Sequence, residues 1–155
     1  MPDRVRVIDI PADPATRRTV AQWCVDEWPH LFPDDTVQWY LDMYDAADRS
    51  GAGVPHALVA VRGGEVVGTA SLVPDDELPG AHEPGPWVAA VFVVPGHRGG
   101  GVGRALVSAL MDRADGDVWL YTENEEAWYE SMGWTRTRES AVNGHRVTVM
   151  HNRSR

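Results

Sequence analysis

The sequence predicts one α/β domain, a mixed and twisted sheet of six to seven strands with about four helices on both faces. Its 155 residues fit the usual length of a single domain. Two pairs of strand-like runs are each joined by a two-residue turn, Gly63-Gly64 and Asn143-Gly144, and such turns are typical of hairpins. Between the hairpins, strand-like runs alternate with helical periodicity, which predicts parallel pairing and helices on both sides of the sheet.

The N-terminal segment predicts a strand followed by a helix. Apolar residues within 5–10 indicate a short strand that ends at Pro11. Asp13-Pro14 is typical of a helix start, because an aspartate side chain caps free backbone N–H groups and proline suits the first turn. Apolar residues at helical spacing then predict a helix over 15–28.

The next segment predicts a second helix and the first hairpin. Apolar and aromatic residues predict a helix over 34–43, and the polar, Gly-rich tract 46–55 predicts a loop. Runs of strand-forming residues at 57–61 and 65–73 make up the hairpin around Gly63-Gly64.

The second half begins with a proline-rich, acidic loop over 74–86, for which a lid, a substrate wall and a plain surface loop are open alternatives. Residues 87–94 are almost continuously apolar, as expected for a central strand that is buried on both faces. The remaining predicted elements are a helix over 101–114, a strand over 118–121, a short helix over 125–132 that Gly133 closes, and a hairpin of 134–142 with 145–150. The last four residues are expected to fray.

The composition excludes several classes of protein. All 14 basic residues are arginine, and the absence of lysine excludes P-loop and Schiff-base chemistry. A net charge of -9 argues against a nucleic-acid partner. Cys24 is the only cysteine and the histidines lack metal-ligand spacing, so no metal site is expected. No segment has the roughly 20 apolar residues of a membrane span, and no secretory leader is recognisable, so a cytoplasmic protein without a membrane partner is expected.

The strongest chemical signal lies in residues 93–106, VVPGHRGGGVGRAL. Here a strand ends and Arg98-Gly99-Gly100-Gly101-Val102-Gly103 opens a helix. Glycines let the backbone approach a ligand closely, and the unpaired N–H groups of a first helical turn favour an anion. The spacing does not fit the dinucleotide-binding pattern, and the P-loop lysine is missing. The segment therefore predicts a phosphate site of another kind, to which Arg98 and Arg104 add positive charge.

This Arg-x-x-Gly-x-Gly pattern after a strand resembles the acetyl-CoA pyrophosphate motif of the GCN5-related N-acetyltransferases (GNATs). A second segment, AWYESMGW at 127–134, is similar to the aromatic-Tyr-x-x-x-Gly-aromatic signature of the same family. The order of predicted elements also matches along nearly the whole chain. The resemblance implies a GNAT-like fold, acetyl-CoA as cosubstrate, no metal, and transfer of an acetyl group to an amine.

The resemblance also implies roles for individual residues. It places the Val91 N–H on the thioester carbonyl and the Val93 backbone against the pantetheine arm. It makes Tyr129 the general acid that protonates the departing CoA thiolate, which a phenol can do if its pKa is lowered or if the transfer is concerted. The cofactor-binding residues that it implies are Val91, Phe92, Val93, Arg98, Gly99, Gly100, Gly101, Val102, Gly103 and Arg104.

The sequence departs from the family pattern at two places. Family members often carry a Glu or His base on the strand before the motif, but Trp87, Ala89 and Val91 stand there. A water chain or a residue of the 74–86 loop must then accept the proton of the attacking amine. The loop candidates are Asp75, Glu77, His82 and Glu83. Asn124 lies closer to Tyr129 than the family's asparagine usually does, so a CoA contact is not carried over to it.

The expected reaction is direct transfer, within a ternary complex, to an amine of a small molecule. Two alternatives stay open: a protein or peptide N-terminal acetyltransferase, and a non-catalytic acyl-CoA-binding module. A deep acidic acceptor pocket favours small cations, whereas an open groove favours peptides. Trp23, Trp28 and Trp39 fall in the segment that often forms the acceptor wall in the family, although core packing is the expected role of at least two. The resemblance also allows a homodimer.

Overall fold

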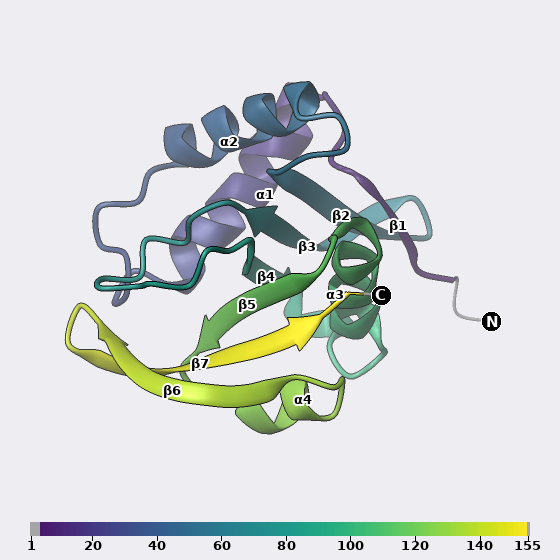
Figure 1. The fold of residues 1–155 in the computed structure, drawn as a ribbon. Coiled ribbons are helices and arrows are strands. Elements are labelled where there is room, and N and C mark those ends of the chain that lie inside the picture. The colour runs from purple at the N-terminus through teal and green to yellow at the C-terminus, as the bar shows by residue number, and fades with distance from the viewer. Residues whose placement is uncertain (1–3, 155) are drawn as a thin grey trace.

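The computed structural model describes residues 4–154 and contains a seven-stranded sheet with the order β1-β2-β3-β4-β5-β7-β6 (Figure 1). Within the described residues, β4 and β5 form the one parallel pair and the other neighbours are antiparallel. The predicted mixed α/β sheet is therefore confirmed. The strands are β1 (Arg6–Asp9), β2 (His56–Arg62), β3 (Glu65–Val73), β4 (Trp87–Val93), β5 (Asp117–Thr122), β6 (Thr135–Val142) and β7 (His145–Arg153).

Helices cover both faces of the sheet, as the sequence predicts. The α-helices of the described chain are α1 (Pro14–Glu27), α2 (Val37–Arg49), α3 (Val102–Arg113) and α4 (Glu126–Glu130). Figure 1 shows α1 and α2 together on one side of the sheet and α3 on the other. Successive residues of β2 pack into opposite cores, with Val59 on the α1–α2 side and Leu58 and Ala60 on the α3 side.

Helix α1 begins as predicted. The Asp13 side chain caps it by accepting a hydrogen bond from the Thr16 N–H at 3.0 Å, and Pro14 occupies its first turn. One turn later, the buried Arg17 guanidinium donates to the Pro11 carbonyl at 2.7 Å and to Asp48 of α2 at 2.8 Å. Charged side chains are buried at low cost only when they are paired, and this pair fixes α1 against α2.

Helix α2 is shifted and longer than the sequence predicts. It begins after Thr36, whose hydroxyl accepts from the Trp39 N–H at 3.1 Å, and it continues to Arg49. The predicted loop over 46–55 is therefore wrong at its start. The alanines there continue the helix, and the Arg17–Asp48 pair holds its last turn.

The C-terminal strand also extends beyond its predicted end. β7 pairs with β5 as far as Asp117 and Arg153, and the Ser154 N–H donates to the Gly116 carbonyl at 2.7 Å. The expected fraying is wrong for residues 152–154, because their backbone groups are paired; Arg155 lies outside the described residues.

Strand β4 is buried on both faces only at its start. Trp87 and Val88 are buried, whereas residues 89–94 are half-buried. The expectation of a fully buried central strand is wrong for this second half, since one edge of it borders a cleft.

Candidate active site

A cleft of about 800 Å³ opens where β4 and β5 separate. The two strands pair at Trp87 and Trp119, and the Trp119 N–H donates to the Pro86 carbonyl at 3.0 Å. No further pairing between them is present in residues 4–154, so the sheet is open beyond this point. Because two parallel strands diverge here, side chains and backbone groups of both reach the cleft.

A β-bulge shapes the β4 side of the cleft. Phe92 pairs with Thr69 and Ala89 with Ser71, so β4 uses one more residue than β3 between these pairs. Ala90 takes a left-handed φ of 55°, and neither Ala90 nor Val91 has a partner in the β3 register. Bulges often redirect backbone groups next to functional sites, and this one leaves the Val91 backbone beside the cleft.

The glycine turn after β4 forms one end of the cleft. Gly99 and Gly101 have φ angles of +80° and +83°, which favour glycine, and Gly101 caps α3 without a side-chain hydrogen bond. The N–H groups of the first turn of α3 therefore have no acceptor within the helix. At Gly103 a Cβ would lie 3.0 Å from the ring of Trp128, so the absent side chain keeps α3 and α4 close.

Three arginines surround this turn. Arg98 donates from Nε to the Val93 carbonyl at 2.8 Å and lies over the Phe92 ring at 5.5 Å. Arg104 donates to the Ser131 hydroxyl at 3.0 Å. Arg62 of β2, which the sequence analysis did not single out, donates to the Gly100 carbonyl at 3.5 Å. The turn is thus both glycine-rich and positively charged, which suits an anion.

The structure brings nearly all the predicted cofactor-binding residues together. Those that line the cleft are Val91, Phe92, Val93, Arg98, Gly99, Gly101, Val102, Gly103 and Arg104. Gly100 is not among the lining residues, and its carbonyl faces Arg62 instead. The Val93 carbonyl already accepts from Arg98, but its second lone pair is left for another donor.

Tyr129 of α4 lines the cleft next to Trp128. It is 7% exposed and packs edge-on against Trp128 and Trp134, with ring centroids 4.8 and 5.9 Å away. Burial raises the pKa of its phenol above the usual value of 10.0. A lowered pKa, one of the two routes by which it could protonate a thiolate, is therefore absent, and a concerted proton transfer is the route that the environment allows.

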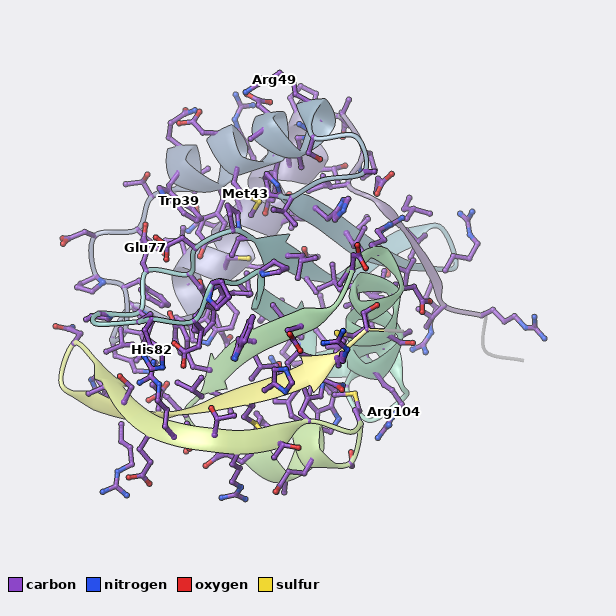
Figure 2. The ribbon with its side chains drawn as sticks, in the orientation of Figure 1. Trp39, Met43, Arg49, Glu77, His82 and Arg104 are labelled. Atoms are coloured by element: carbon purple, nitrogen blue, oxygen red, sulfur yellow. The ribbon has the colours of Figure 1, made fainter. Side chains whose placement is uncertain are left out.

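Carboxylates gather at the other end of the cleft. Figure 2 shows Glu77 on the side of Trp39 and Met43, away from Arg104 at the glycine turn. We call the part formed by residues 91–104 the glycine end. The acidic end is formed by Glu27, Asp35, Asp76, Glu77 and Glu123.

Only one of the four candidate bases reaches this cleft among the described residues. Glu77 lines it, whereas Asp75 is exposed and accepts from the Glu77 N–H at 2.9 Å. His82 is exposed. Glu83 forms a bidentate ion pair with Arg138, with both N···O distances at 2.8 Å, and this pair lowers the pKa of Glu83 to about 2. Sequence reasoning missed Asp76, which also lines the cleft and stands between two other acidic residues in the sequence, Asp75 and Glu77.

The 74–86 loop is a fixed wall of the cleft. The Tyr121 hydroxyl of β5 donates to the Asp76 carbonyl at 2.8 Å, and Arg138 of β6 holds Glu83. Leu78 is buried in the core between these two anchors. Of the three alternatives for this loop, the contacts favour the substrate wall.

Aromatic side chains complete the acidic end. Trp28 and Trp39 line the cleft, and Trp39 is 39% exposed. Trp23 and Trp28 are half-buried and pack against the core on the α1–α2 side, so the core packing expected of at least two of the three is confirmed. Trp23 does not line the cleft and packs beside Phe92, with ring centroids 5.6 Å apart. Asn124 also lines the cleft, as an exposed side chain.

A polar clamp formed by His30, Glu123 and Asn143 lies at the acidic end. His30 Nε2 and Glu123 Oε1 are 2.6 Å apart, and the Asn143 amide donates to the His30 carbonyl at 2.9 Å. The clamp joins the segment after α1 to the end of β5 and to the β6–β7 turn.

Cys24 takes no part in the cleft. It is 2% exposed, and burial raises the pKa of its thiol to about 12, so the thiol stays protonated. Residues 4–154 hold no group of three or more His, Cys, Asp or Glu side chains arranged for a metal ion. Over the same range, every helix is too short or too polar to span a bilayer.

Residues 17–134 match the model of the Acetyltransferase (GNAT) family. The chain therefore belongs to this family, and the resemblance seen in its motifs is confirmed. No curated protein sequence gives a significant match.

Three of the similar solved structures share the fold over nearly their whole length. An aminoglycoside 6'-N-acetyltransferase complexed with coenzyme A has a TM-score of 0.75 at 14% identity, with 97% of each chain covered. The yncA protein of Salmonella typhimurium, solved with its cofactor acetyl-CoA, has a TM-score of 0.72 at 23% identity, covering 97% of this chain and 94% of that one. A ribosomal-protein-alanine N-acetyltransferase from Brucella melitensis has a TM-score of 0.69 at 21% identity, covering 97% and 99%.

Proposed function

We propose that the protein transfers an acetyl group from acetyl-CoA to an amine of a small cationic molecule, directly and within a ternary complex. The observation that carries this proposal is one continuous cleft with a positively charged glycine turn at one end and five carboxylates at the other. Acetyl-CoA supplies the acetyl group as an activated thioester, and it matches the CoA and acetyl-CoA of the structural neighbours.

The glycine end fits a pyrophosphate. Backbone N–H groups at the start of α3 are free, Gly99 and Gly101 leave open space where a Cβ would stand, and arginines add charge. The residues that would hold the pyrophosphate are Arg98, Gly99, Gly101, Val102, Gly103 and Arg104. The Val93 backbone would pair with the pantetheine arm along the open edge of β4, beside Phe92.

Two groups at the middle of the cleft would act on the reacting atoms. The Val91 N–H, which the bulge frees from the β3 ladder, would donate to the thioester carbonyl oxygen and stabilise the charge that develops there. The Tyr129 hydroxyl would give its proton to the CoA sulfur as the bond to the acetyl carbon breaks.

The acidic end favours a small cation as acceptor. Carboxylates attract an ammonium group, and the rings of Trp28 and Trp39 offer faces on which a cation can rest. The aminoglycoside enzyme among the neighbours is named for a small-molecule acceptor, and the ribosomal-protein-alanine enzyme for a peptide one. The charge of this end supports the first kind.

A panel of acceptors tests the proposal. Butylamine, 1,4-diaminobutane, spermidine, an aminoglycoside and a tripeptide with a free α-amine are each incubated with acetyl-CoA, and the CoA thiol released is measured. We expect kcat/KM to be at least tenfold higher for the best multiply charged amine than for butylamine or the tripeptide. A preference for the tripeptide would identify a peptide acetyltransferase instead. Tight acetyl-CoA binding without turnover of any amine would identify a non-catalytic module.

A further inference from the structure

The carboxylates of the acidic end differ in exposure and in partners. Asp35 accepts from the Tyr40 hydroxyl at 3.2 Å, and Glu123 is held by His30 at 2.6 Å. Asp35 and Glu123 are half-buried, whereas Glu27 and Glu77 are exposed. Asp76 is half-buried as well. Unlike the other half-buried carboxylates of the cleft, its side chain forms no hydrogen bond or ion pair with any residue in the range 4–154.

The backbone around Asp76 is fixed on both sides. Tyr121 of β5 donates to the Asp76 carbonyl at 2.8 Å, which ties the loop to the far strand of the open sheet. The Asp75 side chain accepts from the Glu77 N–H at 2.9 Å and closes a turn around Asp76. Asp76 is therefore held in place although no other group binds its carboxylate.

Asp76 lines the same cleft as tyrosines from three different elements, Tyr40 of α2, Tyr121 of β5 and Tyr129 of α4. Burial raises the pKa of each of these phenols, and the negative charge of Asp76 raises it further. One of these is Tyr129, the group proposed to protonate the CoA sulfur.

We propose that Asp76 is the catalytic base, which takes a proton from the ammonium group of the acceptor so that the nitrogen can attack the thioester. This inference rests on the proposed function. It assigns the role that the family's strand residue leaves vacant at Trp87, Ala89 and Val91, and that the sequence analysis left to other residues of the loop.

The surroundings of Asp76 suit this role. Burial and the charges of Glu77, Asp75 and Asp35 raise the pKa of Asp76 well above its usual value of 3.8, closer to that of an alkyl ammonium. A bound ammonium opposes this rise, because a nearby positive charge favours the ionised carboxylate.

The proton balance of the reaction is then complete. An N–H bond of the ammonium breaks and its proton goes to Asp76, after which the nitrogen lone pair forms the bond to the acetyl carbon. The C–S bond breaks, its electron pair goes to sulfur, and Tyr129 protonates the sulfur. The second proton of the nitrogen leaves as the amide forms and restores the Tyr129 phenol; the Asp76 proton passes to water.

The test compares Asp76→Asn with Asp75→Asn. Both remove one negative charge from the same turn, and asparagine at 75 retains an oxygen that can accept from the Glu77 N–H. Single-turnover rates are measured between pH 6 and pH 10 with the amine of highest kcat/KM in the panel, and acetyl-CoA affinity is measured by calorimetry. Asp76→Ala with added formate provides a second test, since formate can replace the missing carboxylate.

We expect Asp76→Asn to lose about 100-fold in rate at pH 7 and less than about tenfold at pH 10, where the amine loses its proton without help. Acetyl-CoA affinity should stay within about twofold, and formate should accelerate the Asp76→Ala variant. Asp75→Asn should keep its plateau rate, with its acid limb moved to lower pH because a charge that raises the pKa of Asp76 is gone.

An equal loss at pH 7 and pH 10, or a rate at pH 7 within about threefold of wild type, would overturn the base assignment alone. Absence of turnover by the wild-type protein would overturn the proposed function and this inference with it, so the two failures are distinguishable.

Discussion

The two ends of the cleft are built from different parts of the chain and in different ways. The glycine end comes from one continuous stretch, residues 91–104, and presents backbone N–H groups with arginines around them. The acidic end is assembled from the end of α1 and the segment after it, from α2, from the 74–86 loop and from the segment after β5, and presents carboxylates and aromatic rings. Backbone groups can be altered only through the shape of the chain, whereas side-chain charges can be changed one at a time. Substitutions at the two ends should therefore affect different measured quantities.

The largest effect is expected for Gly103→Val at the glycine end. A Cβ there would lie 3.0 Å from Trp128 and 3.6 Å from Val93, so a branched side chain displaces these neighbours or the first turn of α3. We expect acetyl-CoA affinity, measured by calorimetry, to fall about 1,000-fold because the N–H groups at the helix start move out of position. Gly96→Ala is the matched control, since its Cβ meets nothing within 4 Å and its φ is ordinary. Affinity within threefold of wild type in Gly103→Val would refute the placement of the pyrophosphate.

Tyr129→Phe should separate chemistry from binding. Phenylalanine keeps the packing against Trp128 and Trp134 and removes the hydroxyl. We expect kcat to fall about 100-fold, at the lower end of the usual range for general acid catalysis, with acetyl-CoA affinity within about threefold. Because burial raises the pKa of Tyr129, the wild-type phenol keeps its proton through pH 9, and no basic limb from this group should appear below that pH. The rate of the chemical step is measured in single-turnover experiments. If Tyr129→Phe lowers this rate by less than threefold, Tyr129 is not the general acid.

Glu83→Gln should weaken the wall of the acidic end without touching the glycine end. The pair with Arg138 lowers the pKa of Glu83 from 4.5 to about 2, so it stabilises the folded state above about pH 4.5 and this stabilisation disappears as the pH falls towards 2. We expect the variant to lose about 2 kcal/mol of unfolding free energy at pH 7 and much less at pH 2.5. Urea unfolding of both proteins at the two pH values measures this. An equal difference at both would show that the ion pair is not its cause.

The smallest effect is expected for Glu77→Gln. Its carboxylate is exposed, and exposed charges contribute up to about 1 kcal/mol to an interaction. We expect KM for a doubly charged amine to rise about fivefold, with little change in KM for butylamine and none in acetyl-CoA affinity. The wild-type KM for the charged amine should also rise with added salt, because salt screens surface charges. If the KM for the charged amine changes neither with the substitution nor with the salt concentration, electrostatic recognition of the acceptor is contradicted.

The same contrast explains what the sequence could predict. The order of elements along the chain, both hairpins and the residues of the glycine end follow from local patterns, since periodicity, turn residues and a contiguous motif are visible along the chain. The last turn of α2 was missed because it depends on Arg17, 31 residues before Asp48. Arg62 was missed for the same reason, as it reaches Gly100 from 38 residues away. Asp76 differs from its acidic neighbours only through the Tyr121 contact and its burial, which no local pattern encodes. A homodimer and a cytoplasmic location stay predictions.

The clamp at the acidic end has a consequence for how the molecule is made. His30 meets Glu123 across 93 residues of sequence and Asn143 across 113. Contacts between such distant parts of a chain form slowly, because a large loop must close before they do. On the ribosome, α1, α2 and the first hairpin emerge long before residue 143 does. A nascent chain can therefore contain all residues of the glycine end before the contacts of the acidic end have formed. The complete cleft is a late product of folding.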